Sequence, residues 1–228
     1  MSESVAFVLG AGQGHGRAIA LTLARLGYRI AAFDFSPMHL EQTIEAIRAG
    51  GGQARAYMGD IIKKIAFQGV VNQITDDWGR IDVAVTALEA NPTATVMALD
   101  EWDWHRALDI NLTVPFLVTQ VCGRIMQAQG GGVIVHLGLG EPVNAPPGVP
   151  YLAGKTGLLG LVPIAAEQWR NTRVRLHAVL TAPPGEGWPR LRPFTELPGP
   201  PQRVAEAVAA LTTPEAAGLT GGLWAPMR

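Results

Sequence analysis

The chain has 228 residues and a formal charge of −1 at pH 7, and 48% of its residues are hydrophobic. This length and apolar content predict a single domain over residues 1–228 and exclude disorder for most of the chain. The near-neutral charge gives no support for binding to nucleic acid or to an anionic membrane surface. The acidic start lacks the basic region of a signal peptide, and no apolar run reaches the roughly 18 residues of a membrane span, so we expect a cytoplasmic protein.

Short apolar runs alternate with helical patterns along the chain. Consecutive apolar residues predict strands that are buried on both faces, as in parallel sheets. The alternation predicts an α/β fold: a single-domain, doubly wound parallel sheet with helices on both faces. The expected strands cover residues 5–9, 29–33, 53–58, 81–85, 133–137, 174–180 and 222–224, and the expected helices cover residues 14–27, 37–49, 63–78, 102–129, 151–170 and 202–211.

A glycine-rich turn at residues 10–16 lies between the first expected strand and the first expected helix. Glycines at such a position allow a tight turn, and they let a pyrophosphate approach the backbone N–H groups at the positive end of the helix. A turn that serves only packing is the alternative. The expected contacts with a dinucleotide are Gly10, Gly12, Gln13, Gly14, His15 and Gly16.

Asp34 follows the second expected strand, 18 residues after Gly16. A carboxylate there can accept hydrogen bonds from both ribose hydroxyls of the adenosine half of the cofactor, and it would repel a 2′-phosphate. The next three residues include no arginine, so the sequence predicts NAD(H) rather than NADP(H). A carboxylate that only caps the next helix is the alternative, although Ser36 before Pro37 fits that role equally well.

Tyr151 and Lys155 stand four residues apart on one face of an expected helix. A nearby cation favours the phenolate, so this pairing predicts a lowered pKa for the Tyr151 phenol and a role in acid/base chemistry. Lys155 is the one lysine of this chain outside the Lys63–Lys64 pair. In a chain with three tyrosines and three lysines, a chance pair at this spacing is expected only about 0.04 times.

These features resemble the short-chain dehydrogenase/reductase family over nearly the whole chain. The resemblance implies a single-domain, Rossmann-like sheet of about seven strands in the order 3-2-1-4-5-6-7. The glycine spacing at residues 10–16 has the family's form, and residues 219–222 are similar to its C-terminal signature. Asp60 and Ile61 are similar to the family's adenine-contacting pair, and Ala87 lies in the segment that the family places beside the cofactor.

The resemblance implies Tyr151 as the acid/base of hydride transfer, Lys155 as the residue that holds the nicotinamide ribose, and Asn111 as the support of a water relay. Asn111 also has an independent argument. Pro115 lacks an N–H group, so the Asn111 carbonyl loses its helical partner, and the helix is expected to kink and to bind a water there. A kink that is merely tolerated is the alternative.

The chain departs from the family pattern at four places. Residues 86–89 replace the family's Asn-Asn-Ala-Gly, which brings Glu89 unexpectedly close to the cofactor, and residues 181–182 replace a Pro-Gly pair. The substrate lid, near residues 183–201, is short for the family. Gly138 and Leu139 stand where the family carries its catalytic serine, whose loss typically costs about 10²–10³ in rate. Candidate substitutes are His136, Asn144 and Thr181, although a buried strand histidine is the stronger interpretation of His136.

Two hypotheses follow. The first is an NAD-dependent oxidoreductase that interconverts an alcohol and a carbonyl, with Tyr151 as acid/base. The second is a relative that binds NAD(H) without ordinary dehydrogenase activity, as a sensor, an assembly partner or a non-redox catalyst. The family resemblance also implies a homodimer or homotetramer, and residues 158–162 are apolar enough for such a contact, although burial in the chain's own core is equally valid. The five histidines show no metal-ligand spacing.

Overall fold

A seven-stranded parallel sheet forms the centre of the computed structural model, which describes residues 4–140, 148–181 and 201–224. The strand order is 3-2-1-4-5-6-7, and every pair is parallel, which confirms the predicted fold class. The five residues of the first strand are all buried, as expected for a strand covered on both faces. The strands are β1 (Val5–Leu9), β2 (Arg29–Phe33), β3 (Ala54–Ala56), β4 (Val83–Thr86), β5 (Gly132–Leu137), β6 (Val174–Val179) and β7 (Leu223–Trp224).

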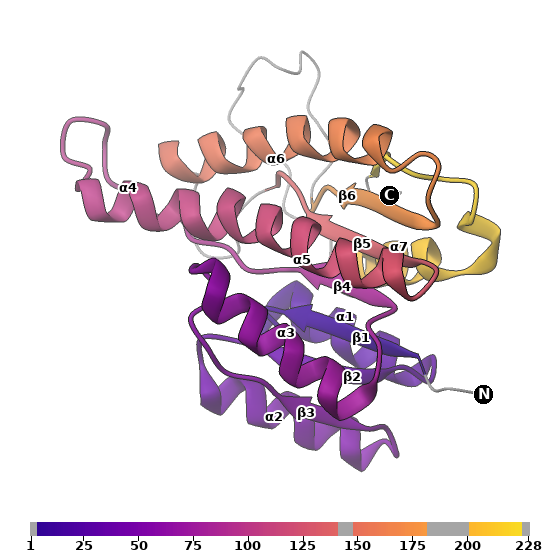
Figure 1. Ribbon diagram of the computed structural model, residues 1–228. Helices are drawn as coiled ribbons and strands as arrows, with labels where there is room; N and C mark the ends of the chain where they lie inside the picture. Colours follow the sequence, from indigo (N-terminus) through magenta and orange to yellow (C-terminus); the bar gives the residue numbers. More distant parts are fainter. Residues whose placement is uncertain (1–3, 141–147, 182–200, 225–228) are drawn as a thin grey trace.

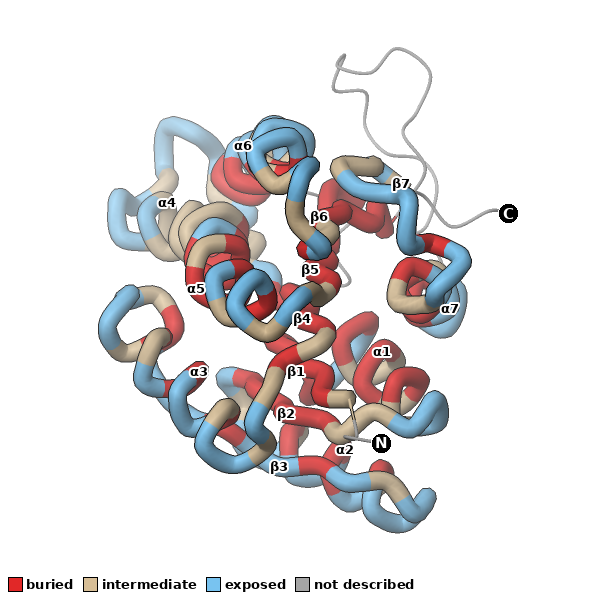
Figure 2. The backbone as a smooth tube through the Cα atoms, turned by 45° about the vertical axis from the view of Figure 1, so that its right-hand side comes forward, coloured by how far each residue is buried: buried red, intermediate tan, exposed pale blue. Residues whose placement is uncertain are grey.

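Helices cover both faces of the sheet and enclose one apolar layer on each side (Figures 1 and 2). One face carries α3 (Lys64–Trp78), α5 (Val114–Ala128) and α6 (Val149–Gln168). The other face carries α1 (Gly14–Arg25), α2 (Pro37–Ala49) and α7 (Pro201–Thr212). In Figure 2 the strands are buried between these two helical layers. A short 3-10 turn spans Pro214–Ala216, after α7.

The long helix expected over residues 102–129 is divided into three parts. It begins as α4 (Glu101–Leu108), widens into a π-helical turn (Asp109–Thr113) and continues as α5. In the wide turn the Val114 N–H bonds to the Asp109 carbonyl, five residues earlier. Pro115 cannot donate the bond that a regular α-helix requires here, and a π turn absorbs that missing donor. The sequence therefore predicted where the helix departs from regular α geometry, but it did not predict a π turn there.

Helix α6 bears on the expectation that no apolar run is long enough to span a membrane. By length and composition alone it is apolar enough to cross a membrane, with a mean hydropathy of 1.3 over an 18-residue window. Lys155 interrupts the apolar residues of this segment, so no uninterrupted run reaches the length of a membrane span, although the whole window is apolar on average. In the structure α6 is a core helix of the domain, because it packs against the sheet through Leu158, Val162 and Ala166.

Several sequence predictions lie outside the described residues. The expected lid near residues 183–201 falls there, except that Pro201 begins α7. Asn144 and residue 182 also lie outside the described part of the chain.

Candidate functional site

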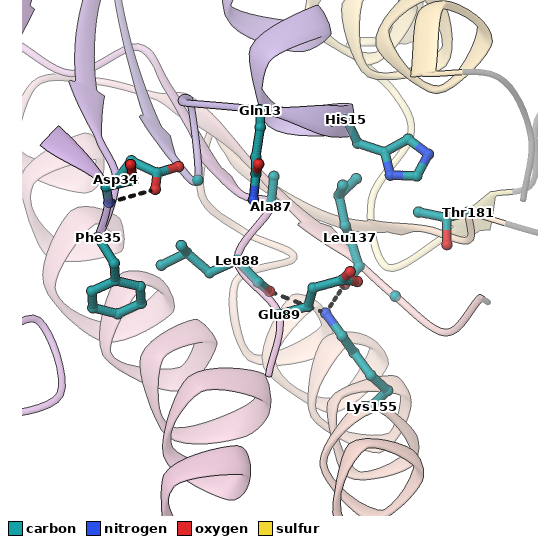
Figure 3. A pocket seen from close by; sticks show the side chains of 14 residues that line it. Gln13, His15, Asp34, Phe35, Ala87, Leu88, Glu89, Leu137, Lys155 and Thr181 are labelled. Carbon is teal, nitrogen blue, oxygen red and sulfur yellow. Dashed lines mark hydrogen bonds between the residues drawn. The ribbon is translucent and has the colours of Figure 1, made fainter. Parts of the chain in front are cut away.

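A cavity of about 410 Å³ opens where the carboxyl ends of five parallel strands meet (Figure 3). In a doubly wound sheet, ligands bind outside these strand ends, where the order of the strands reverses. Here the reversal lies between β1 and β4, and residues directly after both strands line the cavity. The lining residues are Gly10, Gln13, Gly14, His15, Asp34, Phe35, Ser36, Ala87, Leu88, Glu89, Leu137, Gly138, Lys155 and Thr181.

The glycine turn fits closely against the segment after β4. Gly10 has a φ of +88°, and a Cβ there would lie 2.8 Å from the Ala87 carbonyl group. A Cβ on Gly16 would lie only 2.0 Å from the Gly10 carbonyl oxygen. Gly14 has no neighbouring heavy atom within 4 Å of a built Cβ. The turn is therefore tight on its protein side and open towards the cavity at the start of α1.

Asp34 is 8% exposed and bridges the glycine turn to the end of β2. Its Oδ2 accepts a hydrogen bond of 2.8 Å from the Gly12 N–H, and its Oδ1 accepts one of 3.0 Å from the Ser36 N–H. Ser36 itself caps α2 by accepting a bond from the His39 N–H. The capping alternative for Asp34 is therefore wrong, because the serine performs that role while the aspartate lines the cavity.

Lys155 lies at the other end of the cavity from Asp34 (Figure 3). Its ammonium group donates to the Leu137 carbonyl at 2.9 Å and to the Leu88 carbonyl at 3.5 Å. Only 3% of the residue is exposed, and burial lowers the pKa of the ammonium to about 8, against an opposing effect of Glu89. The two carbonyls hold Lys155 between the segment that follows β4 and the last residue of β5.

Tyr151 differs from its expected electrostatic state. The residue is 1% exposed, and its hydroxyl donates a 3.1 Å hydrogen bond to the Gly140 carbonyl. Burial, and secondly the negative charge of Glu89, raise the pKa of the phenol well above its usual range. The expected lowering is wrong for this structure, because Lys155 Nζ lies 5.9 Å from the ring centroid and its charge does not outweigh the desolvation of the phenolate.

Asn111 is fully buried in the π turn, beside the cavity rather than in its lining. Its Nδ2 donates to the Ala90 carbonyl at 2.7 Å, and its Oδ1 accepts from the Ala90 N–H at 3.4 Å. This pair of bonds ties the π turn to the segment that carries Glu89. The side chain therefore positions one wall of the cavity.

Four expected cofactor contacts, Gly12, Gly16, Asp60 and Ile61, lie outside the lining of the cavity. Gly12 and Gly16 support the glycine turn from behind the lining. Asp60 is exposed and pairs with Lys63 at 3.6 Å, whereas the Ile61 side chain is buried in the core. The structure brings neither Asp60 nor Ile61 into the cavity lining, so their predicted contact with adenine stays a prediction.

The residues at the expected serine position and the described candidates to replace it lie in different surroundings. Gly138 lines the cavity, while Leu139 packs in a small apolar cluster with Tyr151 and Leu180. His136 is fully buried between two threonines, with Nδ1 2.6 Å from Thr86 Oγ1 and Nε2 2.8 Å from Thr119 Oγ1. Burial, with a smaller effect of Lys155, lowers its pKa to about 3. His136 is therefore a neutral core histidine, and of the described candidates for the serine role Thr181 is the one that lines the cavity.

Two features of the site are not predicted from the sequence. A Cβ on Gly154 would lie 2.8 Å from the Asn111 Cβ, so this glycine lets α6 approach the π turn closely. Gly154 stands between Tyr151 and Lys155, and a glycine at that place in a helix was the sequence signal for a close approach. The Arg106 guanidinium lies 5.6 Å from the centroid of the Phe35 ring, beside the Asp34 end of the cavity. No local pattern links α4 to the end of β2, so only the fold could reveal this contact.

No three His, Cys, Asp or Glu side chains group as a metal site within residues 4–140, 148–181 and 201–224.

Comparison with known proteins relates this chain to a family of enzymes. A family model described as short chain dehydrogenase matches residues 4–184. D-threitol dehydrogenase of Mycolicibacterium smegmatis is 31% identical over 180 residues, which cover 78% of this chain and 69% of the relative. The 3-oxoacyl-(acyl-carrier-protein) reductase FabG of Thermotoga maritima is 27% identical over 97% of this chain and 95% of its own. The structure of an NAD⁺-bound xylitol dehydrogenase superposes with a TM-score of 0.83 at 27% identity, covering 97% of this chain and 96% of that one.

Proposed function

This chain belongs to the short-chain dehydrogenase/reductase family, and on that premise we propose that it is an NAD(H)-dependent oxidoreductase that interconverts an alcohol and a carbonyl. The observation that carries the proposal is the single cavity joining the glycine turn, Asp34 and Lys155 at the strand ends of the sheet. A dinucleotide needs an acceptor for its adenosine ribose, a cradle for its pyrophosphate and a group at its reacting end, and Asp34, the glycine turn and Lys155 follow one another in that order along the cavity.

The residues present fit such a cofactor. The turn is open at Gly14, where backbone N–H groups at the start of α1 can approach a pyrophosphate. Asp34 would accept hydrogen bonds from the adenosine ribose, and Lys155 would hold the nicotinamide ribose. When bound, the cofactor supplies the group that gives or takes a hydride.

In the proposed reaction, Tyr151 exchanges a proton with the substrate oxygen. For reduction, its hydroxyl leaves the Gly140 carbonyl and donates to the carbonyl oxygen of the substrate as the hydride arrives. For oxidation, the Tyr151 phenol must first lose its proton to solvent, and the resulting phenolate oxygen takes the proton of the alcohol. The raised pKa keeps the proton on Tyr151 at neutral pH, which is the form that donates. Asn111 positions the cavity wall through Ala90, and Thr181 is the hydroxyl able to assist at the substrate oxygen.

The turnover test uses NADH and NAD⁺ with a panel of carbonyls and alcohols that includes threitol, xylitol and a 3-oxoacyl thioester. We expect steady turnover on at least one pair, and its loss in Tyr151→Phe. Tyr28→Phe is the matched control, because Tyr28 lines a separate hollow with Arg175, away from the cavity. Equal rates in Tyr151→Phe and the wild type would contradict the assigned role of Tyr151.

The preference for NAD(H) over NADP(H) is supported by the charge at the adenosine end. Asp34 is a carboxylate in the lining, and among the described lining residues Lys155 is the one lysine or arginine, at the opposite end. Arg106, beside Phe35, is a positive charge near this end, and it would favour NADP(H) instead. We expect NADH to bind more tightly than NADPH, and we expect Asp34→Asn to reduce that difference. Tighter binding of NADPH to the wild type would overturn the preference.

A second candidate function is cofactor binding without ordinary dehydrogenase activity, as a sensor, an assembly partner or a non-redox catalyst. The specific observation in its favour is that the Tyr151 hydroxyl is bonded to the Gly140 carbonyl, outside the described lining of the cavity. Gly138 and Leu139, at the expected place of the family's serine, supply no hydroxyl. Tight NADH binding without turnover on any member of the panel would select this candidate.

The proposal includes self-association through α5 and α6. An apolar hollow of about 850 Å³ lies between these helices, and Phe116 and Ile164 on its walls are 43% and 65% exposed. A homodimer or homotetramer would cover these side chains. Light scattering is expected to show a dimer or a tetramer, and a monomer at micromolar concentration would refute this part. The proposal also includes a cytoplasmic location for the protein and a small molecule as its substrate.

A further inference from the structure

Glu89 is an acidic residue at the reacting end of the cavity. It lies three residues beyond the end of β4, it is exposed, and it lines the same cavity as Lys155 and Thr181. Figure 3 shows its side chain extending towards the Lys155 ammonium group. The backbone of this segment is held by the two Asn111 bonds to the neighbouring Ala90. The fold therefore positions the backbone that carries this carboxylate.

Glu89 and Lys155 thus both line the end of the cavity to which the proposed function assigns the nicotinamide ring. Lys155 donates to two backbone carbonyls, and Glu89 is the one carboxylate among the described lining residues at this end of the cavity. Asp34, the second carboxylate of the lining, belongs to the opposite end. The charge of Glu89 acts on both Tyr151 and Lys155, since it raises the pKa of each. This carboxylate is therefore close enough to affect any charge that enters between them.

We propose that Glu89 selects the redox form of the bound cofactor, favouring the oxidised dinucleotide over the reduced one. The nicotinamide ring carries a positive charge when oxidised and none when reduced, whereas the rest of the cofactor is the same in both forms. Lys155 by itself would repel the oxidised ring, and Glu89 offsets that repulsion. The inference rests on the proposed function, because it assumes that a nicotinamide dinucleotide occupies this cavity.

The test compares the dissociation constants of NAD⁺ and NADH by titration calorimetry at pH 7. In Glu89→Gln we expect the ratio of the NAD⁺ constant to the NADH constant to rise roughly tenfold, the scale of one unit charge acting at close range near a protein surface. Glu89→Asp keeps the charge and is expected to stay near the wild-type ratio. Glu45→Gln removes an equal charge from the exposed face of α2 and is expected to leave the ratio unchanged.

The outcomes separate this inference from the function on which it rests. If both dinucleotides bind and the ratio in Glu89→Gln equals that of the wild type or moves the other way, the inference fails and the proposed function stands. If the wild type binds neither dinucleotide, both fail. Glu89→Ala is a second uncharged variant with the same expected shift, so a folding defect in Glu89→Gln does not remove the test.

Discussion

His136 makes the domain sensitive to acid. The side chain is fully buried between Thr86 and Thr119, and its pKa is lowered from an ordinary value of 6.5 to about 3, first by burial and then by Lys155. Between these two values the unfolded chain binds a proton that the folded domain does not. The contribution of His136 to stability is therefore complete above pH 6.5 and is lost as the pH falls towards 3.

The loss follows from proton linkage. Each pH unit below 6.5 removes about 1.4 kcal/mol of unfolding free energy for one such histidine, so His136 accounts for roughly 3 kcal/mol at pH 4.5. That is a large share of the 5–15 kcal/mol that is typical of whole domains. His177, whose pKa burial and then Arg175 lower to about 4, adds to the same slope. The pH profile of the wild type alone therefore does not isolate His136.

The assay is urea unfolding at several pH values between 4.5 and 7.5, on the wild type and on His136→Gln. The variant loses hydrogen bonds at every pH, so its slope with pH is the informative quantity. We expect the slope to fall by about 1.4 kcal/mol per pH unit below pH 6. His105→Gln, on the exposed face of α4, is the control and is expected to keep the wild-type slope. Equal slopes in His136→Gln and the wild type would refute the reasoning.

Three further substitutions test the construction of the site. Gly16→Ala places a Cβ 2.0 Å from the Gly10 carbonyl oxygen, so we expect dinucleotide binding to fall at least tenfold in calorimetry. Gly154→Ala brings a Cβ within 2.8 Å of the Asn111 Cβ, and urea unfolding is expected to show a loss of about 1–3 kcal/mol. Asn111→Ala leaves the N–H and carbonyl of Ala90 without their side-chain partner, and we expect about 2–4 kcal/mol of destabilisation by the same method.

One glycine variant serves as control for both glycine predictions. A Cβ on Gly69 in α3 meets no heavy atom within 4 Å, so Gly69→Ala is expected to be neutral or slightly stabilising. If Gly69→Ala were as destabilising as Gly154→Ala, helix chemistry rather than the contact with Asn111 would explain the loss. For Asn111, an unchanged unfolding free energy would mean that water replaces the two bonds at no cost.

Most of the architecture was predictable because it depends on local patterns. Consecutive apolar residues, as in β1 and β2, specify strands that are buried on both faces, and strict alternation with helices specifies a parallel, doubly wound sheet. The glycine turn and the position of Asp34 followed from the same local order. The sequence thus predicted which strand ends carry the site, and the structure gathers those ends around one cavity.

The electrostatic state of the site was decided by tertiary contacts. The Tyr–Lys spacing predicted a lowered pKa for the Tyr151 phenol. In the structure, burial and the charge of Glu89, which is distant in sequence, raise that pKa. Asn111 bonds to Ala90, a segment 21 residues away in the chain, and its helix widens into a π turn. The sequence by itself determined which elements form and which residues follow each strand. Only the packed structure determined burial and charge proximity, because both depend on groups brought together from distant parts of the chain.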